Sequence, residues 1–215
     1  MEINKVHCGD AVKLLGDIGH RPNLIIMSPP DLSETSFTLD EYKDFLKESY
    51  GKASAALDDN GVLVSITTDR KLKGEIYTKH IDIIERTPLK LFNYKIHAKS
   101  LKANLYILNY CHMLFFKNNK SKKIVNNKIK SFYPDVWVLE VDKVKGYKTK
   151  DSFPTELIKR IVLNFSNEND LILDPFIGTG KTAVVCKQNN RNYMGFDIDQ
   201  GIVDIANKNI NNNIS

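Results

Sequence analysis

Short apolar runs alternate with amphipathic segments along most of the chain. The runs have the length of strands and stand at 23–27, 62–66, 89–96, 105–116, 170–173 and 193–196. Between and after them, apolar residues recur at helical spacing over 38–57, 154–165, 178–189 and 201–210. Strands that alternate with helices predict a mostly parallel sheet with helices on both faces.

Two boundaries in this pattern are sharply marked. Thr38 is followed three residues later by Glu41, which is the pattern of a capping box at a helix start. The apolar run Asn23–Met27 ends at Ser28-Pro29-Pro30, and two prolines cannot continue a central strand. The sequence therefore predicts a buried strand that stops abruptly at a rigid loop.

The composition is that of one folded domain, which we expect to span residues 1–215. The chain is 42% hydrophobic and 27% charged, with a formal net charge of +5. No apolar run is long enough to cross a bilayer, and the first residues lack the apolar core of a signal peptide. Three widely spaced cysteines predict neither a disulfide framework nor a cysteine-based zinc site. We therefore expect an intracellular protein without membrane association and without a metal.

Basic residues are concentrated in the middle of the chain. Between Glu85 and Asp135 there are eleven basic residues and no acidic one. A biased lysine supply explains the many lysines but not the missing carboxylates, so the segregation favours a polyanionic partner. The lysines expected to contact nucleic acid are Lys99, Lys102, Lys117, Lys120, Lys122, Lys123, Lys128 and Lys130.

A glycine turn follows the apolar run at 170–173. The segment Asp174–Thr182 ends in Gly-Lys-Thr, but Pro175 stands where a phosphate-binding loop needs its first glycine. The dinucleotide fingerprint fails as well, because Ala183 replaces its last glycine. A second acid, Asp197, follows the next apolar run, where a carboxylate can bind a ribose diol. The layout suits an adenosyl ligand without a pyrophosphate; the alternative is an ordinary turn with solvated acids.

These features together resemble the S-adenosylmethionine-dependent amino-methyltransferases of DNA, in the motif order called the β group. The glycine turn resembles that family's methionine-binding turn, although Lys181 stands where threonine is usual. Asp197 matches its ribose-binding acid, and Gly9-Asp10 matches the pair whose acid contacts the adenine. The resemblance implies S-adenosylmethionine as cofactor and S-adenosylhomocysteine as product. It implies the cofactor-binding residues Asp10, Phe153, Pro154, Thr155, Asp174, Phe176, Gly178, Gly180, Thr182 and Asp197.

Further motifs extend the resemblance over nearly the whole chain. Asp135-Val136-Trp137 and Asp151–Leu157 match the segments that precede the glycine turn in the family. Ser28–Asp31 occupies the place of the catalytic motif, and its position before the glycine turn is the permuted order that defines the group. The implied fold is a Rossmann-like, doubly wound α/β domain of the class I methyltransferases. Its sheet is expected to be mostly parallel and seven-stranded, with helices on both faces.

The implied catalytic residues are Ser28, Pro29, Pro30 and Asp31. An exocyclic amine is a weak nucleophile, and the Ser28 hydroxyl and the Pro29 carbonyl are expected to accept hydrogen bonds from both of its N–H groups and to aim its nitrogen at the methyl group. Serine at the first position favours cytosine N4 over adenine N6, which stays the alternative. Asp31 departs from the family's aromatic, because a carboxylate cannot stack on a base but can accept a hydrogen bond or contact a lysine. A second alternative is therefore a catalytically weak nucleic-acid-binding module on the same scaffold.

The expected partner is DNA, either double-stranded with a flipped base or single-stranded. The family's target-recognition insert is reduced here to a lysine-rich segment at about 118–133. Lysine binds phosphate as a point charge, so this segment is expected to anchor the DNA backbone more than to read its sequence. A homodimer and a cognate restriction endonuclease are further partners that the resemblance admits.

Overall fold

The computed structural model describes residues 1–72, 74–99, 109–118, 134–139 and 153–212. Its strands are β1 Lys5–Cys8, β2 Leu24–Met27, β3 Val62–Thr67, β4 Arg70–Leu72, β5 Glu75–Tyr77, β6 Lys90–Ala98, β7 Tyr110–Lys117, β8 Val136–Val138, β9 Leu171–Asp174 and β10 Asn192–Asp197. Its helices are α1 Ala11–Gly16, a 3₁₀ turn Leu32–Glu34, α2 Leu39–Ala56, α3 Lys79–Arg86, α4 Thr155–Phe165, α5 Lys181–Gln188 and α6 Gln200–Asn212. None of the helices in these ranges is long and apolar enough to cross a membrane.

Eight of the described strands form one mixed sheet in the order β1-β10-β9-β2-β3-β7-β6-β8. Every neighbouring pair is parallel except the two that involve β7, so β7 alone runs against the others. The mostly parallel α/β fold is confirmed, but the expected count of seven strands is wrong for this sheet. The extra strand is β8, the Asp-Val-Trp segment, whose Val136 pairs with Ile96 at the outer edge.

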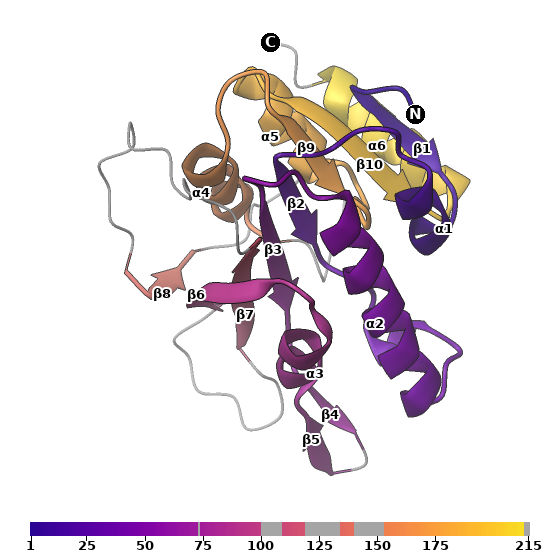
Figure 1. Ribbon diagram of the computed structural model, residues 1–215, viewed down its shortest axis with the longest axis vertical. Coiled ribbons are helices and arrows are strands. Elements are labelled where there is room, and N and C mark those ends of the chain that lie inside the picture. The colour runs from indigo at the N-terminus through magenta and orange to yellow at the C-terminus, as the bar shows by residue number, and fades with distance from the viewer. Residues whose placement is uncertain (73, 100–108, 119–133, 140–152, 213–215) are drawn as a thin grey trace.

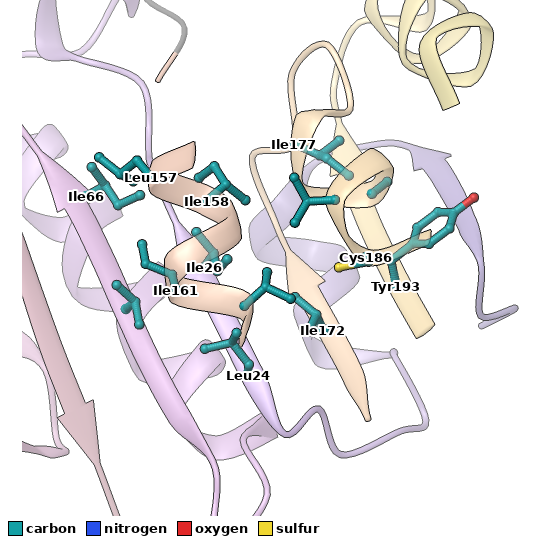
Figure 2. Packing of buried hydrophobic residues seen from close by; sticks show 14 of the residues in the cluster. Leu24, Ile26, Ile66, Leu157, Ile158, Ile161, Ile172, Ile177, Cys186 and Tyr193 are labelled. Atoms are coloured by element: carbon teal, nitrogen blue, oxygen red, sulfur yellow. The ribbon is translucent and has the colours of Figure 1, made fainter. Parts of the chain in front are cut away.

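Helices cover both faces of this sheet (Figure 1). Buried side chains of α1, α2 and α3 share one core cluster, and those of α4, α5 and α6 share the other. Alternate residues of β2 divide between the clusters: Leu24 and Ile26 face α4, whereas Ile25 and Met27 face α1 and α2. Figure 2 shows Leu157 and other side chains of α4 directed at β2 and β3. A strand covered on both faces must be apolar at every position, which explains the continuous run at 23–27.

The predicted boundaries of α2 are confirmed. The Thr38 hydroxyl accepts a hydrogen bond from the Glu41 backbone N–H, and the Glu41 carboxylate accepts one from the Thr38 backbone N–H. The helix then buries Tyr42, Leu46 and Tyr50 along one stripe against the sheet. This capped helix is rigidly seated beside the end of β2, where the prolines lie.

The strand order switches direction between β2 and β9, which are adjacent and parallel. From β2 the chain passes through α2 to β3 on one side, and from β9 it passes through α5 to β10 on the other. In open α/β sheets ligands bind at such a switch point, outside the carboxyl ends of the strands. The sequence motifs that end β2 and β9 therefore lie where a ligand is expected.

Candidate active site

The carboxyl ends of parallel strands bring the predicted motifs to one edge of the sheet. Ser28 follows β2, Asp174 ends β9 and Asp197 ends the next strand, β10. Gly9 follows β1, and its N–H donates to the Asp197 carbonyl at 2.8 Å. Residues that are far apart in the sequence thus share one site because their strands are neighbours.

A cavity of about 440 Å³ opens at this edge. Of the predicted cofactor residues, Phe153, Asp174, Phe176, Gly178, Thr182 and Asp197 line it. Apolar side chains from β2, β3, α4 and the glycine turn complete its wall, among them Ile26, Ile66, Ile158 and Ile177. Such a cavity, largely apolar with a few carboxylates, is typical of a small-molecule site.

The glycine turn is built around a buried carboxylate. Asp174 accepts hydrogen bonds from the Thr182 hydroxyl at 2.6 Å and from the Phe176 N–H at 3.1 Å. Gly180 adopts a φ of +84°, and a Cβ there would lie 2.9 Å from the Cβ of Ala206 in α6. Glycine is therefore required both by the backbone conformation and by the packing of α6.

Burial raises the pKa of Asp174 to about 6, and the nearby Asp197 charge adds to the rise, although the two hydrogen bonds oppose it. Asp174 has no ion pair within the described residues. A buried carboxylate without a cation is costly to the fold. Asp174 would therefore be stabilised by a positively charged ligand, in a cavity that Lys181 also lines.

Lys181 stands where the family's glycine turn usually has threonine, and its side chain has a defined contact. Its ammonium group donates a hydrogen bond to the Phe153 carbonyl, which joins the glycine turn to the segment before α4. Phe153 lines the cavity, so this bond helps to hold one wall in place. The lysine is thus compatible with the same turn.

A smaller cavity of about 110 Å³ lies beside the first. Ser28, Glu34, Ile66 and Phe153 line both cavities, so the Ser28 side chain stands at their junction. Within the described residues the Ser28 hydroxyl makes no hydrogen bond. It is therefore available to a molecule that bridges the two cavities.

The proline loop is fixed by α2. Tyr42 is fully buried in that helix, and its hydroxyl donates to the Pro30 carbonyl at 2.6 Å. The Asp31 backbone N–H donates to the Glu34 carboxylate at 2.7 Å. These bonds hold the loop in one conformation before any ligand binds, which is what alignment of reactants requires.

Asp31 does not stack; it forms ion pairs with two cations. Its carboxylate accepts from the Lys79 ammonium group and from the Arg70 guanidinium, with Arg70 Nε at 2.6 Å. The expectation that Asp31 contacts a lysine is confirmed. Burial opposes the ionisation of Asp31, but Lys79 and Arg70 outweigh it and hold the pKa of the carboxyl below its usual range. All three line the smaller cavity.

Some predicted residues lie near the cavities without lining them. The Asp10 carboxylate caps α1 by accepting from the N–H groups of Val12 and Lys13. Pro154 and Thr155 begin α4, and Gly180 begins α5. Their placement gives them structural roles at the same edge of the sheet.

The predicted nucleic-acid lysines divide between two places. Lys99 lines the smaller cavity. Lys117 pairs in register with Val62 at the start of β3, so it lies at the end of the strands opposite to Ser28. Lys102, Lys120, Lys122, Lys123, Lys128 and Lys130 lie outside the described residues, as does nearly all of the predicted insert at 118–133.

Sequence reasoning missed Glu34, Arg70 and Lys79, which line the smaller cavity with Asp31. Arg70 is 39 residues and Lys79 48 residues from their partner, so no local spacing reveals the pairs. An acid in place of the usual aromatic at position 31 was the available signal. An acid at that position is expected to pair with a cationic side chain from another part of the chain.

Comparison with known proteins agrees with this geometry. A family model of DNA methylases, the N6 and N4 methyltransferases, matches residues 23–208. The chain belongs to this family. M1.MboII, a type II methyltransferase of Moraxella bovis, is 27% identical to this methylase over 96% of both chains. M.BglII, a type II methyltransferase of Bacillus subtilis, is 34% identical over 45% of the chain.

Solved structures share the fold of this methylase. The cytosine-N4-specific PvuII DNA methyltransferase superposes with a TM-score of 0.81 at 15% identity, covering 97% of this chain and 90% of that one. The complex of M1.HpyAVI with S-adenosylmethionine gives 0.74 at 20% identity, covering 96% and 98%. The chain spans only 28% to 39% of the length of the first curated relatives it matches, M.BglII among them.

Proposed function

We propose that this methylase transfers the methyl group of S-adenosylmethionine to the exocyclic amine of a DNA base, with cytosine N4 as the target. The supporting observation is the position of Ser28 at the junction of the two cavities. The larger cavity holds the cofactor and the smaller one receives the base. The methyl group then leaves sulfur and bonds to nitrogen across that junction.

The larger cavity suits S-adenosylmethionine by charge. This cofactor carries an ammonium group and a sulfonium, and Asp174 is a buried carboxylate that forms no ion pair within the described residues. Asp197, at the end of the neighbouring strand, is placed for the ribose diol. PvuII DNA methyltransferase and M1.HpyAVI share this fold, and M1.HpyAVI was solved with S-adenosylmethionine.

At the junction, Ser28 and Pro29 act on the amine. The serine hydroxyl and the proline carbonyl accept hydrogen bonds from its two N–H groups, so that the nitrogen lone pair points at the methyl group. The proline loop is held by Tyr42, so this geometry exists before the base arrives. Positioning of this kind lowers barriers by about 7–11 kcal/mol in well-aligned reactions. After transfer the nitrogen loses one proton to solvent, so no general base is needed.

The base must leave the duplex or come from a single strand to enter the smaller cavity. Lys99 and Arg70 border that cavity and suit the adjoining phosphates. Serine at position 28 favours cytosine N4, as the resemblance implies, and the family also contains adenine-N6 enzymes. Residues 1–215 act as one methyltransferase domain, whose DNA contacts extend into the lysine-rich segment at 118–133.

The test is product analysis. Purified protein is incubated with S-adenosylmethionine and unmethylated double- or single-stranded DNA, and the DNA is digested to nucleosides for mass spectrometry. N4-methylcytosine is the expected product, and it should disappear with Ser28→Ala but persist with Ser33→Ala, an exposed serine nearby. N6-methyladenine as the product would show that the target base is adenine and not cytosine. DNA binding without any methylated nucleoside would favour the binding-module alternative.

A further inference from the structure

A cluster of two histidines and one aspartate lies behind the wall of the smaller cavity. Asp69 follows β3, His80 is in the first turn of α3 and His112 is on β7. His80 Nδ1 lies 2.9 and 2.8 Å from the two carboxylate oxygens of Asp69, and His112 Nε2 lies 3.2 Å from one of them. One donor atom from each residue falls within 4.8 Å of the others. Three separate elements thus bring metal-ligating atoms close together, and the two imidazole rings stack with their centroids 3.9 Å apart.

The two histidines are the main partners of the Asp69 carboxylate. Asp69 is only 3% exposed, and within the described residues its partners are the two imidazoles and the His80 backbone N–H. No lysine or arginine pairs with it there, since the neighbouring Lys79 pairs with Asp31. Buried carboxylates are normally paired with a cation or coordinate a metal.

The outer contacts of the cluster resemble those of a metal site. The Tyr94 hydroxyl lies 2.6 Å from His112 Nδ1, which fixes the ring with Nε2 directed at Asp69. A ligating histidine usually has such a partner on its far nitrogen. In a tetrahedral zinc site, bonds of about 2.0–2.1 Å place donor atoms roughly 3.3 Å apart. The imidazole-to-carboxylate spacings of 2.8 to 3.2 Å need only a small expansion to reach that value, and the stacked rings have to turn so that both nitrogens point at one ion.

We infer that Asp69, His80 and His112 bind one divalent transition-metal ion, with zinc as the representative. Two imidazole nitrogens and one carboxylate oxygen are a donor set for zinc or cobalt and not for magnesium or calcium, which prefer oxygen ligands. Water supplies the fourth ligand. The ion fastens the end of β3 to α3 and β7, and so braces Thr67 and Thr68 in the wall of the smaller cavity. It takes no part in methyl transfer, and its three ligands are too far apart in the sequence for spacing to predict them.

Metal content and affinity test this inference directly. Untagged full-length protein is stripped with a chelator, given zinc chloride alone, and passed through gel filtration before elemental analysis. One zinc per chain and a higher melting temperature are expected. Cobalt should give the visible absorption of a tetrahedral site. Neither readout depends on DNA or on methylation, so a failed activity assay does not bear on the result.

Two ligand variants and one control make the assignment specific. Asp69→Asn and His80→Gln keep side chains of similar size, and each is expected to weaken zinc binding by ~10–100-fold or more. His20→Gln removes an exposed histidine far from the cluster and should leave zinc binding unchanged. Circular dichroism checks that each variant is folded. Wild-type protein that retains no zinc, or folded variants that retain as much as the wild type, would overturn the inference and leave a cluster held by hydrogen bonds alone.

Discussion

Restoring the family's aromatic at position 31 should damage this protein. Asp31 is 8% exposed and forms ion pairs with Lys79, which is 2% exposed, and with Arg70. The variant Asp31→Tyr removes the carboxylate and leaves the Lys79 ammonium group buried without a counter-charge. Burial already lowers the pKa of Lys79, which shows how strongly that site disfavours a lone cation. The expected outcome is lower stability and no gain in methylation.

The size of the effect follows from the burial of the pair. Removing one partner of a buried ion pair costs about 3–5 kcal/mol. For a domain of this size, each kcal/mol changes the melting temperature by about 2–4 °C, so Tm should fall by roughly 6–20 °C. Arg70 is more exposed than Lys79, and its pair with Asp31 is screened by solvent, so it contributes less.

A double-mutant cycle isolates the pair. Free energies of unfolding in urea are measured for the wild type, Asp31→Tyr, Lys79→Met and the double variant. We expect the loss from Asp31→Tyr to shrink by more than about 1.5 kcal/mol when Lys79 is already methionine. Asp44→Tyr, on the exposed side of α2, is the matched control and should change stability little. If Asp31→Tyr matched the wild type in both backgrounds, the argument from buried charge would be wrong.

Three other substitutions follow from the same geometry. Asp174→Asn should stabilise the protein by on the order of 2–3 kcal/mol above pH 6. The pKa of Asp174 is raised to about 6, so the protein loses stability as the pH rises from about 4 to 6 and this buried carboxyl ionises, whereas asparagine does not ionise. Urea unfolding between pH 4 and 8 checks this, and an advantage that persists below pH 4 would contradict it. Gly180→Ala should cost about 1–3 kcal/mol through its positive φ and its contact with α6, whereas Gly51→Ala, in open space on α2, should cost nothing; thermal melts compare them. Thr67→Val should raise Tm, because the buried Thr67 hydroxyl has no hydrogen-bond partner within the described residues, whereas Thr182→Val, which removes the bond to Asp174, should lower it. Equal effects at the two threonines would refute the last reasoning.

The arrangement of the strands was predictable because burial on both faces leaves an unmistakable pattern. The runs at 23–27 and 62–66 are apolar at nearly every position, and β2 and β3 lie there with both faces covered. The edge strand β8 was not predicted as a strand. It has three residues, and its Val136 and Val138 are exposed, so it lacks any periodic signal. Its place in the sheet comes from pairing with β6.

The residues of the site likewise fall into those that the sequence predicted and those that it did not. Ser28, Asp174 and Asp197 follow apolar runs, so the strand ends and the rule for parallel sheets place them together. The partners of Asp31 and Asp69 come instead from the β4–β5 hairpin, α3 and β7, and their distances along the chain carry no pattern. Local sequence predicts what ends a strand. It does not predict which distant side chain crosses over to meet it.

The carboxylates at the ends of two adjacent strands differ in whether protein cations neutralise them. Asp31, after β2, is neutralised by the protein's own cations, and its pKa stays low. Asp174, at the end of β9, accepts hydrogen bonds from a hydroxyl and a backbone N–H and has no cation beside it in the part of the chain that the structure describes, and its pKa rises to about 6. A neutralised carboxylate stabilises the fold, whereas an uncompensated one leaves the cost of burial to be offset by a cationic ligand. Under the proposed function, the larger cavity would gain from a positively charged cofactor, and the smaller one would hold a neutral base against a loop that is already fixed.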